Sequence, residues 1–281
     1  MSQKSEFTVV IQGPLHKNSI SNIEYYKSIG HVVISYWKEE DDTYFSKGGD
    51  TSLVDHLRGD PEVTLVEKEL PTEGIIPIPK DNIFGNRRNP DYDRSWAATD
   101  KLMRENPGCH IFNEHFVYVH CLSTLNGVKA ANSDYIIKVR ADEKWGDLSP
   151  FVDRIRKSPN KMITTPIAFT RDAAHKFHAS DHAFCMSREN ALRAMEIATS
   201  KCENPPTLPR FTFNIAGNMV EKVCASEVII TTSFLEAVGE KIDWDNSIKI
   251  MRENVEMVHL SEFGDILYHV YGHGHVSDHN F

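Results

Sequence analysis

Apolar and polar positions alternate in blocks along the first 140 residues, and each block has the length of one secondary-structure element. Continuous apolar runs at residues 8–12, 31–37 and 135–140 predict buried strands, and a shorter run at 62–67 predicts another. Gly13-Pro14 ends the first run, as a chain breaker does. The predicted strands are therefore separated by enough chain to hold helices.

Helices are predicted in those intervals. Ser19 is a candidate cap for a helix that runs to Ile29 and stops at Gly30. Residues 51–58 predict a short helix, and apolar side chains at helical spacing over 111–131 predict a long one crossing the sheet face. Alternating strands and helices predict an α/β fold with a mostly parallel central sheet flanked by helices. Such sheets bind ligands beyond the carboxyl ends of their strands.

The pattern is less regular after Pro150. Residues 151–157 predict a helix, and residues 162–167 predict a strand. Ser187 is a candidate cap for a helix to Ala198, and Ser226 for a helix over 227–238. Residues 202–209 predict a proline-rich loop.

Composition narrows the function classes. The chain has 281 residues, a formal charge of −9 and 25% charged residues, which are ordinary globular proportions with an acidic balance. The acidic balance argues against a nucleic-acid partner. Five cysteines without a CxxC pair exclude a zinc ribbon and predict buried, reduced thiols. No apolar run is long enough for a signal segment or a membrane span, so a cytoplasmic location is expected.

Charged residues gather where the strand at 135–140 ends. Asp142 and Glu143 offer hard oxygen ligands that suit Mn²⁺ or Mg²⁺. Lys138 and Arg140 lie two residues apart on one strand face, where they could hold phosphate oxygens. A carboxylate-bound metal beside basic side chains would stabilise a departing nucleoside diphosphate. The alternative is a surface turn whose ion pairs contribute little.

Several motifs in order carry a family resemblance. They are Ile11-Gln12-Gly13-Pro14, Asn18-Ser19-Ile20, Val33-Ile34-Ser35-Tyr36-Trp37, Ser123-Thr124-Leu125-Asn126-Gly127-Val128 with Ala130, and the run from Tyr135 to Asp142. The chain resembles the WavE-type lipopolysaccharide-synthesis proteins and, more loosely, glycosyltransferases encoded by large algal viruses. Both groups are associated with the GT-A fold. The resemblance covers residues 8–145; beyond it, residues 180–184 and Ser226-Glu227 are weaker echoes.

The resemblance implies where a nucleotide sugar would bind. The implied site is formed by Gln12, Gly13 and Pro14, with Ser35 and Trp37 close by. His120 stands where relatives tend to carry Gln, and no role is assigned to it.

The resemblance also places Arg140-Ala141-Asp142 where other GT-A enzymes carry Asp-x-Asp. Because the first position is Arg140, we expect Asp142 to be the main metal ligand and Arg140 to contact the diphosphate.

Two carboxylates are candidates for the base that an inverting transferase needs. Asp181 lies in a polar island, His178 to His182, where neighbouring histidines could tune it; its alternative is an ordinary turn aspartate. Glu227 lies at a predicted helix start, where the dipole would favour the ionised form, and its alternative is simple capping.

Two further basic features lie in segments predicted to be irregular. Arg87 and Arg88 lie in a long loop at 71–93 and could contact phosphate or acceptor; the alternative is a solvated loop. The final segment holds His269, His273, His275 and His279, which could bind a metal or close over the site, or could form a solvated tail.

The sequence thus predicts one GT-A-like domain over 1–281, with a Rossmann-like nucleotide-sugar half at 1–145 and an acceptor half with the His-rich tail at 146–281. The predicted activity is metal-assisted transfer of a monosaccharide from a nucleoside diphosphate sugar, UDP-linked, to a glycan, with inversion. The virus-type resemblance suggests xylose or a deoxyhexose. The alternatives are a nucleotide-sugar hydrolase or nucleotidyltransferase, and a non-enzymatic metal-binding module.

Overall fold

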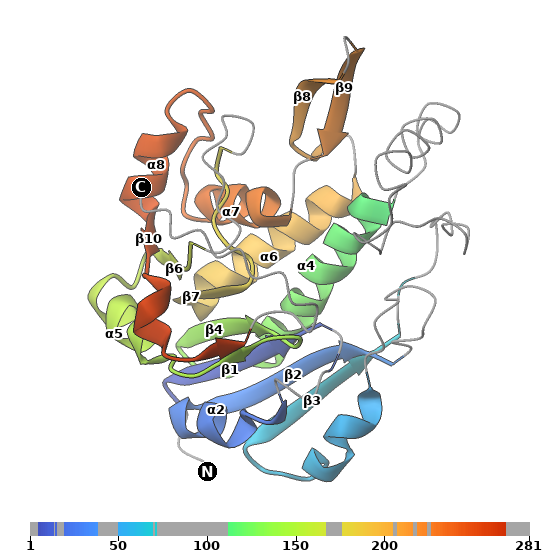
Figure 1. The fold of residues 1–281 in the computed structure, drawn as a ribbon, viewed down its shortest axis with the longest axis vertical. Helices are drawn as coiled ribbons and strands as arrows, with labels where there is room; N and C mark the ends of the chain where they lie inside the picture. Colours follow the sequence, from blue (N-terminus) through green and yellow to red (C-terminus); the bar gives the residue numbers. More distant parts are fainter. Residues whose placement is uncertain are drawn as a thin grey trace.

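The structure is a computed structural model that describes residues 5–13, 15, 20–38, 50–69, 71, 112–166, 176–204, 207–215, 218–223 and 226–267. A seven-stranded sheet in the order β10-β6-β7-β4-β1-β2-β3 forms its centre (Figure 1). The strands are β1 (Phe7–Gln12), β2 (His31–Trp37), β3 (Val63–Lys68), β4 (Tyr135–Arg140), β6 (Met162–Thr164), β7 (Ala183–Ser187) and β10 (Val255–Met257). Strands from both predicted halves of the chain thus join one sheet.

The sheet is mostly parallel. β3, β2, β1 and β4 run parallel to one another, and β10 runs parallel to β6. β7 is antiparallel to both of its neighbours, β4 and β6. One antiparallel strand in an otherwise parallel sheet agrees with the predicted mostly parallel sheet. The predicted α/β fold class, a mostly parallel central sheet flanked by helices, is confirmed.

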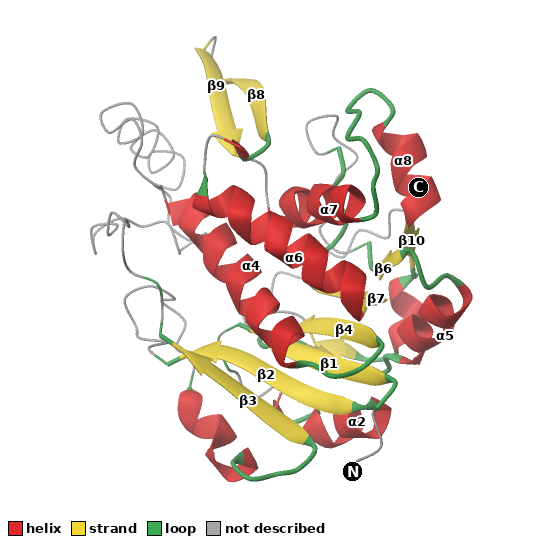
Figure 2. Cartoon of the chain, turned by 180° about the vertical axis from the view of Figure 1, so that it is seen from behind, coloured by secondary structure: helices red, strands yellow, loops and turns green. Residues whose placement is uncertain are grey.

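Helices cover both faces of the sheet (Figure 2). They are α2 (Ile23–Ile29), α4 (Phe112–Ala130), α5 (Ser149–Lys157), α6 (Arg188–Glu203), α7 (Ser226–Ala237) and α8 (Ser247–Asn254), with the 3-10 turns η1 (Thr51–Leu57) and η4 (Leu260–Phe263). Two small antiparallel pairs complete the described elements: β5 (Lys144–Trp145) with β11 (Ile266–Leu267), and the projecting hairpin of β8 (Arg210–Ile215) and β9 (Asn218–Val223) (Figure 1).

Successive residues of each central strand face opposite layers, since side chains alternate along a strand. On β4, Ile136 joins the apolar cluster under α4, α6 and α7, whereas Ile137 joins the cluster with α2 and α5. α4 lies very close to β1: a Cβ on Gly127 would collide with Cγ1 of Val10. Glycine therefore permits the approach that seats α4 over the strands that build the site.

Most predicted elements are confirmed, with changed ends. The first helix begins at Ile23 after Asn22, and the predicted cap Ser19 lies outside the described residues. The helix at 51–58 is a 3-10 turn, and the strand from Met162 ends at Thr164. α6, which Ser187 caps as predicted, continues to Glu203, because apolar Ala198 and Cys202 still face the core.

Other elements were not predicted: β5, β7, the β8–β9 hairpin, α8, β10, η4 and β11. Most of them are short, so each carries little periodicity for a sequence pattern to reveal.

The structure bears on two expectations: the lack of a membrane span and the burial of reduced cysteines. Among the described residues, no helix combines the length and apolar character that crossing a bilayer requires. Cys121, Cys185 and Cys202 are buried free thiols, as predicted, whereas Cys109 and Cys224 lie outside the described residues.

Candidate active site

Three predicted site residues lie side by side at the carboxyl ends of adjacent strands. Gln12 on β1 pairs in register with Ser35 on β2 and with Arg140 on β4. By strand alternation, all three side chains are on the face covered by α4. We call Gln12, Gly13, Ser35 and Arg140 the strand edge. Here the parallel register alone assembles residues more than 100 positions apart.

The end of β1 presents a buried polar side chain and a special backbone. Gln12 is only 5% exposed, and its Oε1 has no hydrogen-bond partner among the described residues. Gly13 adopts φ 112°, a conformation that side chains other than hydrogen rarely allow, and its N–H donates to the Ser35 carbonyl at 3.3 Å. Gly13 therefore turns the chain sharply where β1 ends. Pro14, the third predicted residue here, lies outside the described residues.

Ser35 and Trp37 hold α4 on β2. Ser35 Oγ donates to the Ser123 carbonyl at 2.7 Å, and Ser123 Oγ donates back to the Ser35 carbonyl at 3.1 Å. Trp37 is buried against Val119 and Leu122. Both side chains shape the edge of the site by fixing the helix above it.

Arg140 and Asp142 form a two-pronged ion pair. Arg140 donates from Nε to Oδ1 at 2.9 Å and from Nη2 to Oδ2 at 2.8 Å. The side chains are 17% and 14% exposed, so both remain within reach of a ligand. Burial lowers the pKa of Arg140, but Asp142 and Glu143 outweigh it and raise that pKa, so the guanidinium stays charged.

Glu143 connects the Arg140–Asp142 ion pair to His182. Its side chain is fully buried, and Oε1 lies 3.7 Å from Arg140 Nε and in hydrogen-bond contact with His182 Nδ1. Its Oε2 has no partner among the described residues. Burial lowers the pKa of His182, yet Glu143 outweighs it and the net pKa is raised. The Glu143 carboxylate thus orients the imidazole of His182 through Nδ1.

Asp181 is held from three elements. Ser226 Oγ of α7 donates to its Oδ2 at 2.7 Å, His120 Nε2 of α4 lies 3.5 Å from the same oxygen, and Lys138 Nζ of β4 donates to its carbonyl. Burial raises the pKa of Asp181, but the positive charges of Lys138 and Arg140 outweigh it and hold that pKa well below its usual range. Asp181 is therefore an ionised, buried carboxylate, and its Oδ1 has no partner among the described residues.

Glu227 lies beside the same Ser226 hydroxyl as Asp181, but its pKa is raised, whereas the pKa of Asp181 is lowered. Ser226 Oγ lies 3.1 Å from Glu227 Oε2. Burial and the charge of Asp181 raise the pKa of Glu227 to about 7. The expectation that the helix start keeps Glu227 ionised is thus wrong, because desolvation and a like charge exceed the effect of the helix dipole.

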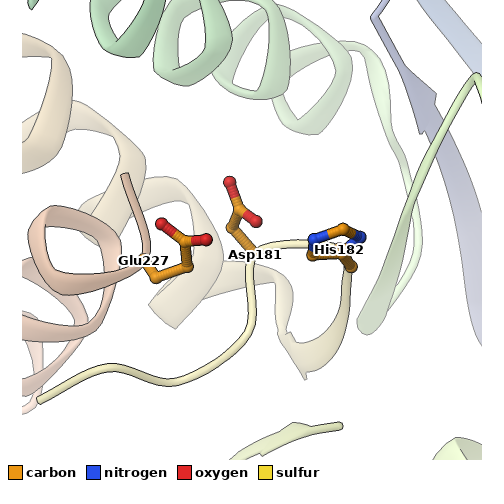
Figure 3. A group of neighbouring side chains, drawn as sticks. All are labelled: Asp181, His182 and Glu227. Carbon is orange, nitrogen blue, oxygen red and sulfur yellow. The ribbon is translucent and has the colours of Figure 1, made fainter. Parts of the chain in front are cut away.

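Asp181, His182 and Glu227 also satisfy the spacing of a metal site. One potential ligand atom from each lies within 4.8 Å of the others, and Figure 3 shows the three side chains on neighbouring segments. Two carboxylates and an imidazole suit Mn²⁺ or another transition metal better than Mg²⁺. Asp142, the predicted metal ligand, is outside this group and contacts Arg140 instead.

The structure therefore brings together predicted site residues from distant parts of the chain and adds two to which the sequence assigned no site role. Asp181 and Glu227, predicted as rival bases, are neighbours through Ser226. His120 and Ser226 are the additions; Ser226 was predicted as a cap but is the first residue of α7. A polar residue within an apolar helical pattern, as His120 is, was the available signal. Arg87, Arg88 and the four C-terminal histidines lie outside the described residues.

Comparisons with known proteins give only distant likenesses. No protein-family model matches the chain, and no curated protein matches it significantly. The apo structure of WbbM, a bifunctional glycosyltransferase, is similar with a TM-score of 0.38 and 10% identity, over 92% of this chain and 39% of that chain. The crystal structure of HddC from Yersinia pseudotuberculosis is similar with a TM-score of 0.34 and 11% identity, over 66% of this chain and 79% of that chain.

This chain therefore spans well under half the length of WbbM. The WavE-type resemblance stays a prediction.

Proposed function

We propose that the protein is a glycosyltransferase that moves a monosaccharide from a nucleoside diphosphate sugar to a hydroxyl acceptor. One observation carries this proposal: a charged arginine at the strand edge adjoins a carboxylate pair of which one member is ionised and the other has a pKa near neutrality. Glu143 links the two: its Oε1 lies 3.7 Å from Arg140 Nε and contacts Nδ1 of His182, the residue after Asp181. A cation for a leaving diphosphate and a base for an incoming hydroxyl are what this reaction needs.

The donor half of the proposal rests on the strand edge. Nucleotides bind beyond the carboxyl ends of parallel strands, where Gln12, Gly13 and Arg140 lie. Gln12 Oε1 is a buried acceptor free to take a hydrogen bond from the ligand. Pro14 is a further proposed contact at the end of β1, and Arg87 and Arg88 remain proposed phosphate contacts. Ser35 and Trp37, predicted to lie close by, are proposed to act by fixing α4 beside the ligand.

The acceptor half rests on Glu227, which we favour as the base over Asp181. With a pKa of about 7 and 13% of its side chain exposed, it is partly ionised at neutral pH and accessible. It takes the proton of the acceptor hydroxyl while that oxygen bonds to the anomeric carbon. The bond from that carbon to the diphosphate breaks, and the electron pair leaves with the diphosphate beside Arg140. Asp181 stays ionised and fixes Ser226 between the two carboxylates.

A divalent cation fits this site chemically. Asp142 carries an accessible carboxylate that Arg140 shares, and the unpartnered Oδ1 of Asp181 lies in the second group of possible ligands. When bound at Asp142, Mn²⁺ or Mg²⁺ would neutralise charge on the diphosphate.

The test is a screen of UDP- and GDP-sugars with and without Mn²⁺. Ligands that bind the native state raise its melting temperature, so donors can be ranked without a known acceptor. Release of nucleoside diphosphate, to water or to simple glycosides, then defines the reaction. Sugar 1-phosphate and nucleoside monophosphate as products would instead indicate a nucleotide-sugar hydrolase. No thermal shift and no product with any donor would refute the proposal.

A second candidate, a metal-binding protein without catalysis, is favoured by the Asp181–His182–Glu227 group. Glu227 cannot act as a base while it ligates a cation, so the two proposals exclude each other at this residue. Calorimetry with Mn²⁺ or Zn²⁺ alone separates them: tight binding that Glu227→Gln removes, without any nucleotide affinity, supports the second.

A further inference from the structure

Lys138 is buried below the strand edge. Its side chain is 0% exposed, although it was predicted to hold phosphate oxygens. Arg140, two residues further along β4, lies about 7 Å closer to the ligand side at the usual strand rise. The ammonium of Lys138 already contacts the Asp181 carbonyl, His120 Nε2 at 3.4 Å and the Phe184 ring at 5.8 Å from its centroid. A phosphate at the edge is therefore better placed for Arg140 than for Lys138.

An ammonium at this position is costly to bury, since a Met of similar length would fill the same space without desolvation. Burial lowers the pKa of Lys138 to about 8, so the side chain still carries its charge at pH 7. Burial and Lys138 lower the pKa of His120 to about 3, so His120 is neutral. A neutral imidazole facing an ammonium accepts at Nε2, and it therefore cannot donate from that nitrogen to Asp181.

The contacts on Asp181 come from both of its ends. Lys138 fixes the carbonyl, and Ser226 fixes Oδ2 at 2.7 Å, which leaves Oδ1 free. Ser226 also lies between Asp181 and Glu227. A shift of the Asp181 peptide would therefore be passed to Glu227 through one hydroxyl group.

We propose that Lys138 is a positioning residue: with Ser226 it holds Asp181 in place, and through Ser226 it places Glu227 for attack on the acceptor hydroxyl. Its ammonium acts on the protein, not on the diphosphate. This inference rests on the proposed glycosyl transfer, and it assigns Lys138 to the acceptor side of the reaction.

Lys138→Met separates the positioning role from diphosphate binding. Calorimetry with UDP and with GDP, each with Mn²⁺, should give the wild-type affinity within about twofold and the wild-type stoichiometry, which counts the folded sites. Release of nucleoside diphosphate at saturating donor should fall about 100-fold, the cost of a misplacement of about 1 Å. An affinity loss of tenfold or more with turnover retained would show direct diphosphate binding and overturn the proposal, as would turnover within threefold of wild type.

Ile136→Val is the matched control, because Ile136 lies on the same strand and face, is equally buried and makes no polar contact. It should change neither affinity nor turnover. If Lys138→Met does not fold, Ser226→Ala tests the same hold on Asp181: an approximately tenfold loss of turnover at unchanged nucleotide affinity is expected, and undiminished turnover contradicts it.

One measurement does not depend on the reaction. Crystal structures of the wild type and of Lys138→Met should show the Asp181 carboxylate displaced by about 1 Å or more, and an unmoved carboxylate would refute the positioning role. A wild type that releases no product from any donor would refute the proposed function instead.

Discussion

The strand edge and the network of buried side chains around Asp181 are built in different ways. The edge consists of residues that end neighbouring parallel strands, and backbone register aligns Gln12, Ser35 and Arg140. The network around Asp181 consists of side chains from β4, α4, α7 and the segment before β7, which meet through buried polar contacts. Backbone pairing of the strands survives a change of side chain, whereas a buried hydrogen-bond network is disrupted when one partner is lost. We therefore expect a substitution of a ligand-facing residue at the strand edge to change nucleotide affinity, and a substitution in the network around Asp181 to change turnover.

The largest effect is expected for Glu227→Gln. Removing the base should lower turnover by about 10²- to 10⁴-fold, while the affinity for UDP or GDP with Mn²⁺ stays unchanged. Product release and calorimetry measure the two quantities. Glu236→Gln, an exposed position on the same helix, is the control and should behave as wild type. A loss of nucleotide affinity in Glu227→Gln would erase the proposed difference between the two regions.

A second large effect is expected for Asp142→Ala. This variant removes the predicted metal ligand and the two-pronged ion pair with Arg140, so transfer should be lost while the fold survives. Calorimetry should show a fall of about 10- to 100-fold in Mn²⁺-dependent nucleotide affinity, the range for losing a charged contact. Asp153→Ala, exposed on α5, is the control. Wild-type turnover in Asp142→Ala would refute the metal role.

The pH dependence of stability tests whether the pKa of Glu227 is raised while that of Asp181 is lowered. The carboxyl of Glu227 ionises at about 4.5 in the unfolded chain but near 7 in the folded protein, so the folded state binds more protons in between. Glu227 therefore contributes on the order of 3 kcal/mol to the free energy of unfolding below pH 4.5, and this contribution is lost as pH rises through 7. Denaturation in EDTA at pH 5 and pH 8 should show a steeper loss for the wild type than for Glu227→Gln. Equal slopes would contradict the raised pKa.

The smallest effect is expected for Ser35→Ala. The variant loses the hydrogen bond from β2 to α4, which should lower the free energy of unfolding by about 1 kcal/mol. Urea denaturation measures it, and Ser28→Ala, which removes an exposed bond within α2, serves as the control. A tenfold loss of nucleotide affinity in Ser35→Ala would instead indicate direct contact with the ligand.

Hydrophobic patterning alone determined the central strands and the helices between them. The runs at β1, β2 and β4 were predicted within one residue, because a strand buried on both faces is apolar throughout. The same pattern placed Gln12 and Arg140 at strand ends, hence at one edge of a parallel sheet.

Tertiary structure decided the proton affinities and the partners. The helix start at Glu227 suggested an ionised carboxylate, but burial beside Asp181 reverses that, and burial depends on packing between α7 and the segment before β7. Likewise, Lys138 and Arg140 are equivalent in the sequence pattern, yet only one of them is wholly enclosed. Periodicity reports which face a residue occupies; desolvation and charge pairing depend on neighbours distant in the chain, which only the folded arrangement brings together.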